Sequence, residues 1–152
     1  MVDYLRIDHF RGFEAYWAVP AGEETAINGK WKKGPGVELF NAIKEAMGDD
    51  MKIFAEDLGI ITPEVEALRD ECGFPGMKVL QFGFEAWPTD PFYPHNFKTT
   101  NCICYTGTHD NNTTFGWYED AKEEARDRVR RYLNCDGGNV SWDFIRLAMS
   151  SI

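Results

Sequence analysis

The chain opens with a short run of β-prone residues that ends in polar ones. Val2, Tyr4, Leu5 and Ile7 favour a strand, and Gly12 closes the run with a turn. We therefore predict a buried first strand with a polar tip.

The same alternation of apolar runs and helical periods continues along the chain. Three more strands are predicted over residues Met51–Ala55, Met77–Phe82 and Asn101–Tyr105. Helices are predicted over residues Val37–Met47, Pro63–Cys72, Asp120–Leu133 and Trp142–Met149. Glycines at Gly48 and Gly73 end the first two helices, and Thr62 with Pro63 begins the second.

Strands that alternate with helices at this spacing indicate a parallel sheet. A complete (β/α)8 barrel takes roughly 250 residues, whereas this chain has 152 residues. The predicted fold class is therefore α/β: roughly half of a (β/α)8 TIM barrel, with about four parallel strands alternating with helices.

A long polar segment, Ala21–Gly36, separates the first strand from the first helix. It shows no periodic pattern, and loops of this length are often functional. Trp31 lies in this segment between lysines. An exposed Trp can stack on a sugar ring, or it can fold back as a local hydrophobic anchor, and the sequence leaves both open.

Composition limits the class of protein. The aromatic content, with 11 Phe, 6 Tyr and 5 Trp, indicates a globular chain of one domain at most. The net charge of -9 argues against a nucleic-acid partner. No apolar run approaches the roughly 20 residues of a membrane span, and the N-terminus lacks the pattern of a signal peptide. We expect no membrane partner and a cytoplasmic location.

The four cysteines, Cys72, Cys102, Cys104 and Cys135, form no CxxC pair. Cys102 and Cys104 lie on one face of an apolar strand, which favours core packing. We predict neither a metal site nor a disulfide.

Arg6 and Asp8 are the first candidates for chemistry. Side chains two residues apart on a strand share a face, so the guanidinium lies beside the carboxylate and favours its ionised form. An ionised, oriented carboxylate suits a nucleophile, although a purely structural ion pair has the same pattern.

Three carboxylates occupy equivalent places. Asp8, Glu56 and Asp110 each follow the carboxyl end of a predicted strand. Barrel enzymes assemble their active sites at that end of the sheet. Carboxylates there can also cap helices or bind metals, so placement alone leaves those roles open.

The strings around these carboxylates resemble a known family. Arg6–Gly12, Ala55–Gly59 and Gly107–Asn111 resemble the three signature regions of the α-amylase clan, and in full they look like the 4-α-glucanotransferase (amylomaltase, disproportionating enzyme) family. Similarity extends to Gly34–Gly36 and Gly116–Tyr118, and so through nearly the whole chain.

The resemblance implies a retaining double displacement. Asp8 would be the nucleophile, Glu56 the general acid and base, and Asp110 the carboxylate that binds sugar hydroxyls and stabilises the transition state. The resemblance and the aromatic candidates together give a set of substrate-binding residues: Arg6, His9, His109, Asp57, Trp31 and Phe82. Core packing is the other interpretation of the two aromatic residues.

One position departs from the family pattern. We expect Asp after Asn111 in many relatives, whereas this chain has Asn112. Loss of that charge could alter the support of Asp110.

The resemblance further implies a function and its partners. The donor and acceptor would be maltooligosaccharides or starch-like α-1,4-glucans, with no organic cofactor and no metal. A glucan hydrolase of the same clan and a non-catalytic glucan-binding piece are the alternatives. We expect residues 1–152 to form one partial catalytic barrel domain, truncated at both ends, with no second domain and inactive by itself.

Overall fold

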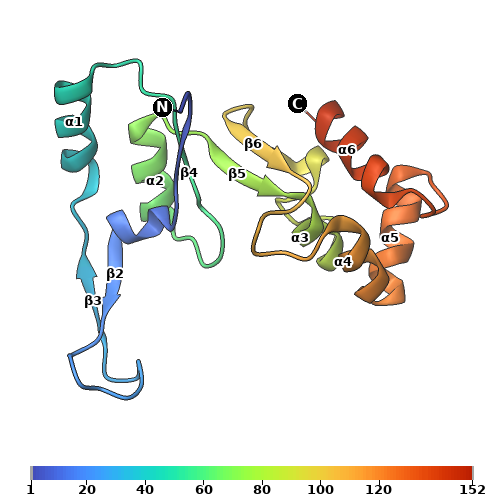
Figure 1. Cartoon of the computed structure of the whole chain (residues 1–152), viewed down its shortest axis with the longest axis horizontal. Helices are drawn as coiled ribbons and strands as arrows, with labels where there is room; N and C mark the ends of the chain where they lie inside the picture. Colours follow the sequence, from blue (N-terminus) through green and yellow to red (C-terminus); the bar gives the residue numbers. More distant parts are fainter. Residues whose placement is uncertain (1, 152) are drawn as a thin grey trace. The chain divides into compact units, whose positions relative to one another are not determined.

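The computed structural model describes residues 2–151, which divide into two compact units at Met77. Figure 1 shows the succession of strands and helices along the chain. No helix within residues 2–151 has both the length and the apolar character needed to cross a bilayer.

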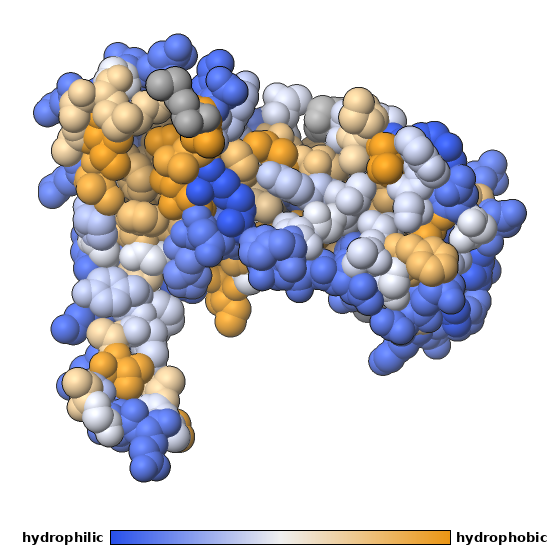
Figure 2. Space-filling view, viewed as in Figure 1, coloured by the Kyte–Doolittle hydropathy of each residue, from blue (hydrophilic) through white to orange (hydrophobic). Residues whose placement is uncertain are grey.

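The first unit contains the predicted parallel pair. Strand β1 (Leu5–Ile7) pairs in parallel with β4 (Ile53–Ala55), with Leu5 opposite Ile53 and Ile7 opposite Ala55. The prediction of a buried first strand is wrong, because Leu5 is half-exposed and apolar side chains reach the surface of this unit (Figure 2). β4 carries the buried residues of the pair.

Both predicted helices of the first unit are confirmed. Helix α1 spans Gly36–Met47, and helix α2 spans Pro63–Cys72. Gly48 and Gly73 follow them with φ of 90° and 73°, a conformation that costs glycine little. The two helices and the strand pair enclose one core: Phe10, Phe40, Ile53, Ala55, Val65, Leu68, Cys72 and Phe74.

A hairpin replaces part of the predicted polar loop. Strand β2 (Ala15–Ala18) pairs antiparallel with β3 (Lys30–Lys33), so the expectation of an aperiodic segment is wrong at its end. Trp17 lies opposite Trp31 with ring centroids 5.4 Å apart, and its indole N–H donates to the Ala26 carbonyl at 2.8 Å. This cross-strand aromatic pair stabilises β3, which the sequence did not predict because three of its four residues are lysines. A 3-10 turn, η1 (Phe10–Phe13), precedes the hairpin.

The second unit places a small sheet against four helices. Strand β5 (Gly76–Val79) runs into this unit and pairs with β6 (Cys102–Tyr105). The helices are α3 (Leu80–Glu85), α4 (Thr114–Asp120), α5 (Glu123–Leu133) and α6 (Val140–Ser150), with a 3-10 turn η2 (Pro94–Asn96). Cys102 and Cys104 pack against the core of this unit, as predicted. The core consists of Leu80, Phe84, Tyr93, Phe97, Trp117, Tyr118, Val129, Val140 and Phe144.

Two predictions of element bounds are wrong in this unit. The third predicted strand ends at Val79 and becomes helix α3, because Leu80 and Phe84, four residues apart, are both buried in the core. Phe82 therefore lies on a helix, packed against Phe92 at 5.4 Å, and not at a strand tip. The helix predicted over Asp120–Leu133 begins at Glu123 as α5. The sequence did not predict α4, which precedes it and which Thr113 caps by accepting from the Gly116 N–H at 3.1 Å.

Gly34 is the glycine on which the hairpin register depends. A Cβ there would lie 2.3 Å from the Phe13 carbonyl oxygen, which is backbone and cannot move aside. We expect Gly34→Ala to accelerate amide hydrogen exchange of Tyr16 and Lys32, which form a hydrogen-bonded pair of this hairpin, by about tenfold or more. Gly138→Ala is the control, because its Cβ would meet only the Asp136 side chain at 3.2 Å. Unchanged exchange in Gly34→Ala would contradict this role.

Candidate active site

The parallel pair gains one extra residue at its carboxyl end. Asp8 and Glu56 directly follow the paired residues Ile7 and Ala55, and the Glu56 N–H donates to the Ile7 carbonyl at 2.9 Å. In a regular parallel ladder the next bond would come from the His9 N–H to the Glu56 carbonyl. Here the Phe10 N–H makes that bond, at 3.0 Å, so the first strand bulges by one residue.

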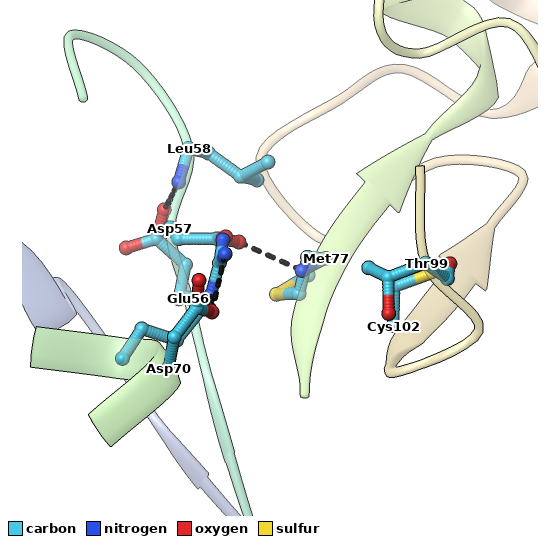
Figure 3. A network of polar contacts seen from close by, with 8 residues as sticks. Glu56, Asp57, Leu58, Asp70, Met77, Thr99 and Cys102 are labelled. Atoms are coloured by element: carbon cyan, nitrogen blue, oxygen red, sulfur yellow. Dashed lines mark hydrogen bonds and ion pairs between the residues drawn. The ribbon is translucent and has the colours of Figure 1, made fainter. Parts of the chain in front are cut away.

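The bulge turns the His9 N–H toward a side chain. His9 has a left-handed conformation, with φ 48° and ψ 50°, and its N–H donates to Glu56 Oε2 at 2.7 Å. The Leu58 N–H donates to Glu56 Oε1 at 2.8 Å, a contact visible in Figure 3. Backbone donors thus position both carboxylate oxygens of Glu56, one from the segment after β1 and one from the segment after β4.

Asp8 lies at the same edge and faces solvent. Its side chain is 71% exposed, and Arg6 Nη1 lies 2.8 Å from Asp8 Oδ1. The predicted Arg6–Asp8 pair on one face is therefore confirmed. A fixed guanidinium leaves the other carboxylate oxygen of Asp8 open to a ligand.

Asp57 has a different environment from its neighbour Glu56. Its side chain is 6% exposed, pairs with Arg69 of α2, and accepts from the Met77 N–H at 2.7 Å (Figure 3). Gly76 leaves room for it, because a Cβ there would lie 2.3 Å from Asp57 Oδ2. Burial lowers the pKa of Arg69, but hydrogen bonds to Asp70 and Asp57 outweigh it and leave that pKa raised. These contacts give Asp57 a structural task, and its substrate-binding role stays a prediction.

Trp31 combines the two interpretations that the sequence left open. It packs against Trp17, and the Arg11 guanidinium lies 4.5 Å from the centre of its ring, yet its side chain is 56% exposed. Arg11 also donates to the Ile60 carbonyl at 2.8 Å, which fixes the guanidinium over the indole. Sequence reasoning missed Arg11, because both of its partners are distant along the chain.

In the second unit, an ordered turn after β6 carries Asp110 and His109. Asn111 Oδ1 accepts from the Thr108 N–H at 2.9 Å and from the Thr108 hydroxyl at 3.0 Å. The Asp110 N–H donates to the same hydroxyl at 3.3 Å, and His109 Nε2 lies 3.4 Å from Asp110 Oδ1. Both side chains are largely exposed on a turn that hydrogen bonds define.

Asn112 has a partner that explains its amide. Asn112 Nδ2 donates to Asp120 Oδ2 at 3.3 Å, and its backbone carbonyl accepts from Gln81. A carboxylate in place of the Asn112 amide would therefore face Asp120. Among the described residues, no hydrogen bond joins the Asn112 side chain to Asp110.

Eight of the nine predicted site residues fall into three groups, and the ninth, Trp31, lies on the β2–β3 hairpin. Arg6, Asp8, His9 and Glu56 lie together at one edge of the first unit. His109 and Asp110 lie together in the second unit. Asp57 and Phe82 are occupied by packing and hydrogen bonds.

Comparison with known sequences decides the family. The family model described as 4-alpha-glucanotransferase matches residues 1–152. The chain belongs to the 4-alpha-glucanotransferase family. The resemblance drawn from the three motifs is therefore confirmed.

Relatives of this family match nearly the whole chain. A 4-alpha-glucanotransferase from Synechocystis sp. is 55% identical over 152 residues, which are 99% of this chain and 30% of the relative. One from Thermus thermophilus is 51% identical over 156 residues, covering 97% of this chain and 31% of the relative. The chain thus spans about 30% of the length of these relatives.

A solved structure supports the fold class. The amylomaltase from Streptococcus agalactiae in complex with acarbose matches with a TM-score of 0.90 and 40% identity, over 98% of this chain and 30% of that one. The prediction of an α/β fold with parallel strands and helices is therefore confirmed.

We expect Asp57→Asn to lower the free energy of unfolding by about 3 kcal/mol, because it leaves the Arg69 charge without its buried partner. Asp70→Asn is the matched control: Asp70 pairs with the same Arg69 at 2.7 Å but is largely exposed. Its loss should cost less than about 1 kcal/mol. Urea titrations measure both, and equal effects would contradict the structural task of Asp57.

We expect Asn112→Asp to destabilise the second unit by about 1 kcal/mol at low salt, because it sets a carboxylate against Asp120. Adding Asp120→Asn should restore most of the loss, and high salt should reduce it. A double-mutant cycle from urea titrations measures the coupling. Additive effects of the two changes would show that the contact has no energetic role.

Proposed function

We propose that this chain supplies the catalytic carboxylates of a 4-alpha-glucanotransferase, which transfers α-1,4-glucan segments between maltooligosaccharides or starch-like glucans. One observation carries the proposal: the bulge at His9 joins the Asp8 turn to the Glu56 carboxylate at the end of the β1–β4 pair. Two carboxylates of a retaining enzyme must lie about 5 Å apart, and this bond keeps their two backbones in register.

The chemistry follows from the two environments. An Asp8 oxygen attacks the anomeric carbon as the glycosidic bond breaks, and Glu56 gives a proton to the departing 4-oxygen. Each carboxyl oxygen has two acceptor sites, so Glu56 can keep its backbone donors while it carries the proton. The 4-hydroxyl of an acceptor glucan then attacks the same carbon, returns its proton to Glu56 and releases Asp8.

The other predicted residues hold the sugar. Asp110 is proposed to bind sugar hydroxyls and to stabilise the transition state, and His9 and His109 are each proposed to contact the glucan. Arg6 keeps Asp8 oriented through the 2.8 Å ion pair. The exposed part of Trp31 and the ring of Phe82 are proposed as aromatic platforms, with Asp57 supporting the site from within.

We also propose a context for the chain. Residues 1–152 would form part of one (β/α)8 catalytic barrel domain, with further strands supplied by the longer protein. The parallel β1–β4 pair and the 30% coverage of the relatives support this. The proposed enzyme needs no organic cofactor or metal and acts in the cytoplasm.

The test is a chimera in which this sequence replaces the matched segment of the Synechocystis relative. We expect the chimera to convert maltotriose into both glucose and longer oligomers. Asp8→Asn and Glu56→Gln should each lower that rate by at least about a hundredfold. Glu64→Gln, an exposed carboxylate on α2, is the control and should leave the rate unchanged.

A maltosyl fluoride donor separates the two roles, because fluoride departs without a proton. The Glu56→Gln chimera should therefore regain glycosylation with this donor, whereas Asp8→Asn should not. Near wild-type transfer from maltotriose by either variant would remove that residue from its role. Glucose and maltose as sole products from maltotriose would indicate a hydrolase.

A further inference from the structure

A polar cavity of about 290 Å³ opens beside His109 in the second unit. Its lining is rich in hydroxyl and amide groups, from Thr106, Thr108, Asn111 and Thr113 among others. Apart from His109, none of its lining residues has a side chain that carries charge. A cavity of this kind fits a neutral ligand with several hydroxyls better than an ion or a hydrocarbon.

Gln81 contributes a buried acceptor to this cavity. Its side chain is 2% exposed and lines the cavity, and its Nε2 donates to the Asn112 carbonyl at 3.2 Å. A carbonyl only accepts, so this bond fixes which end of the amide is nitrogen. The other end, Oε1, is buried and has no hydrogen-bond partner among the described residues.

The backbone leaves room for this arrangement. A Cβ at Gly107 would lie 2.6 Å from Gln81 Nε2 and 3.4 Å from its Oε1. Only glycine lets the amide lie across the turn that leads to His109. A buried acceptor without a donor is costly, and it persists when a ligand or water supplies one.

We propose that Gln81 is a substrate-binding residue whose Oε1 accepts a hydrogen bond from a hydroxyl of the glucan. This inference rests on the proposed function and adds a residue to it. The hydroxyl belongs to a sugar unit held in the cavity beside His109. Because Gln81 also holds the Asn112 carbonyl, one amide joins the ligand to the turn that carries His109 and Asp110.

The test compares two substitutions in the chimera with the Synechocystis relative. Gln81→Met removes the acceptor and the donor at similar size, and should raise KM for maltotriose by about tenfold with kcat changed less than about threefold. Gln81→Glu retains an acceptor, and its buried carboxyl stays protonated and donates to the Asn112 carbonyl. It should keep KM within about threefold of the parent chimera.

A structural role predicts a different pattern. If Gln81 only supports the turn through the Asn112 carbonyl, Gln81→Met should lower the thermal midpoint and kcat as well as raise KM, or should leave KM unchanged; either result overturns the proposal. Maltotriose binding by calorimetry to the Asp8→Asn chimera, with and without Gln81→Met, gives a readout that needs no turnover. A tenfold weaker Kd supports the Gln81 contact even where the assignment of Asp8 fails.

Discussion

The hydrogen bond from the His9 N–H to Glu56 connects the two halves of the proposed chemistry. It exists because one extra residue in the first strand shifts the ladder bond to Phe10 and frees the His9 donor. The left-handed conformation of His9 is the local cost of that shift, since residues other than glycine seldom adopt it. Such a cost is typical of a functional position.

Glu56 and Asp57 are neighbours in the chain but have different tasks, because successive side chains at a strand end point in opposite directions. Glu56 is held by backbone donors near the polar edge, whereas Asp57 is buried against Arg69 and Met77. The buried pair ties helix α2 and the start of β5 to the strand end. The position of Glu56 therefore depends on an ion pair that takes no part in the chemistry.

Sequence predicted the features that local rules decide. Pro63 and Gly73 mark the ends of α2, and the spacing of Arg6 and Asp8 predicts their ion pair. The sequence did not predict the features that depend on contacts between residues far apart in the chain. Phe82 lies on a helix because Leu80 and Phe84 are drawn into a core made by later segments, and the β2–β3 hairpin depends on a Trp pair separated by a long loop. Nothing in the spacing of Asp57 and Arg69 could predict their contact, and the open acceptor of Gln81 becomes apparent only in three dimensions.

In the proposed mechanism Asp8, placed beside Glu56 by the His9 bulge, forms the bond to the sugar. The most direct measurement is peptide mapping by mass spectrometry after the Glu56→Gln chimera reacts with maltosyl fluoride in the absence of acceptor. We expect a maltosyl ester on Asp8. An ester on Asp110 or another carboxylate, or turnover without any ester, would contradict it.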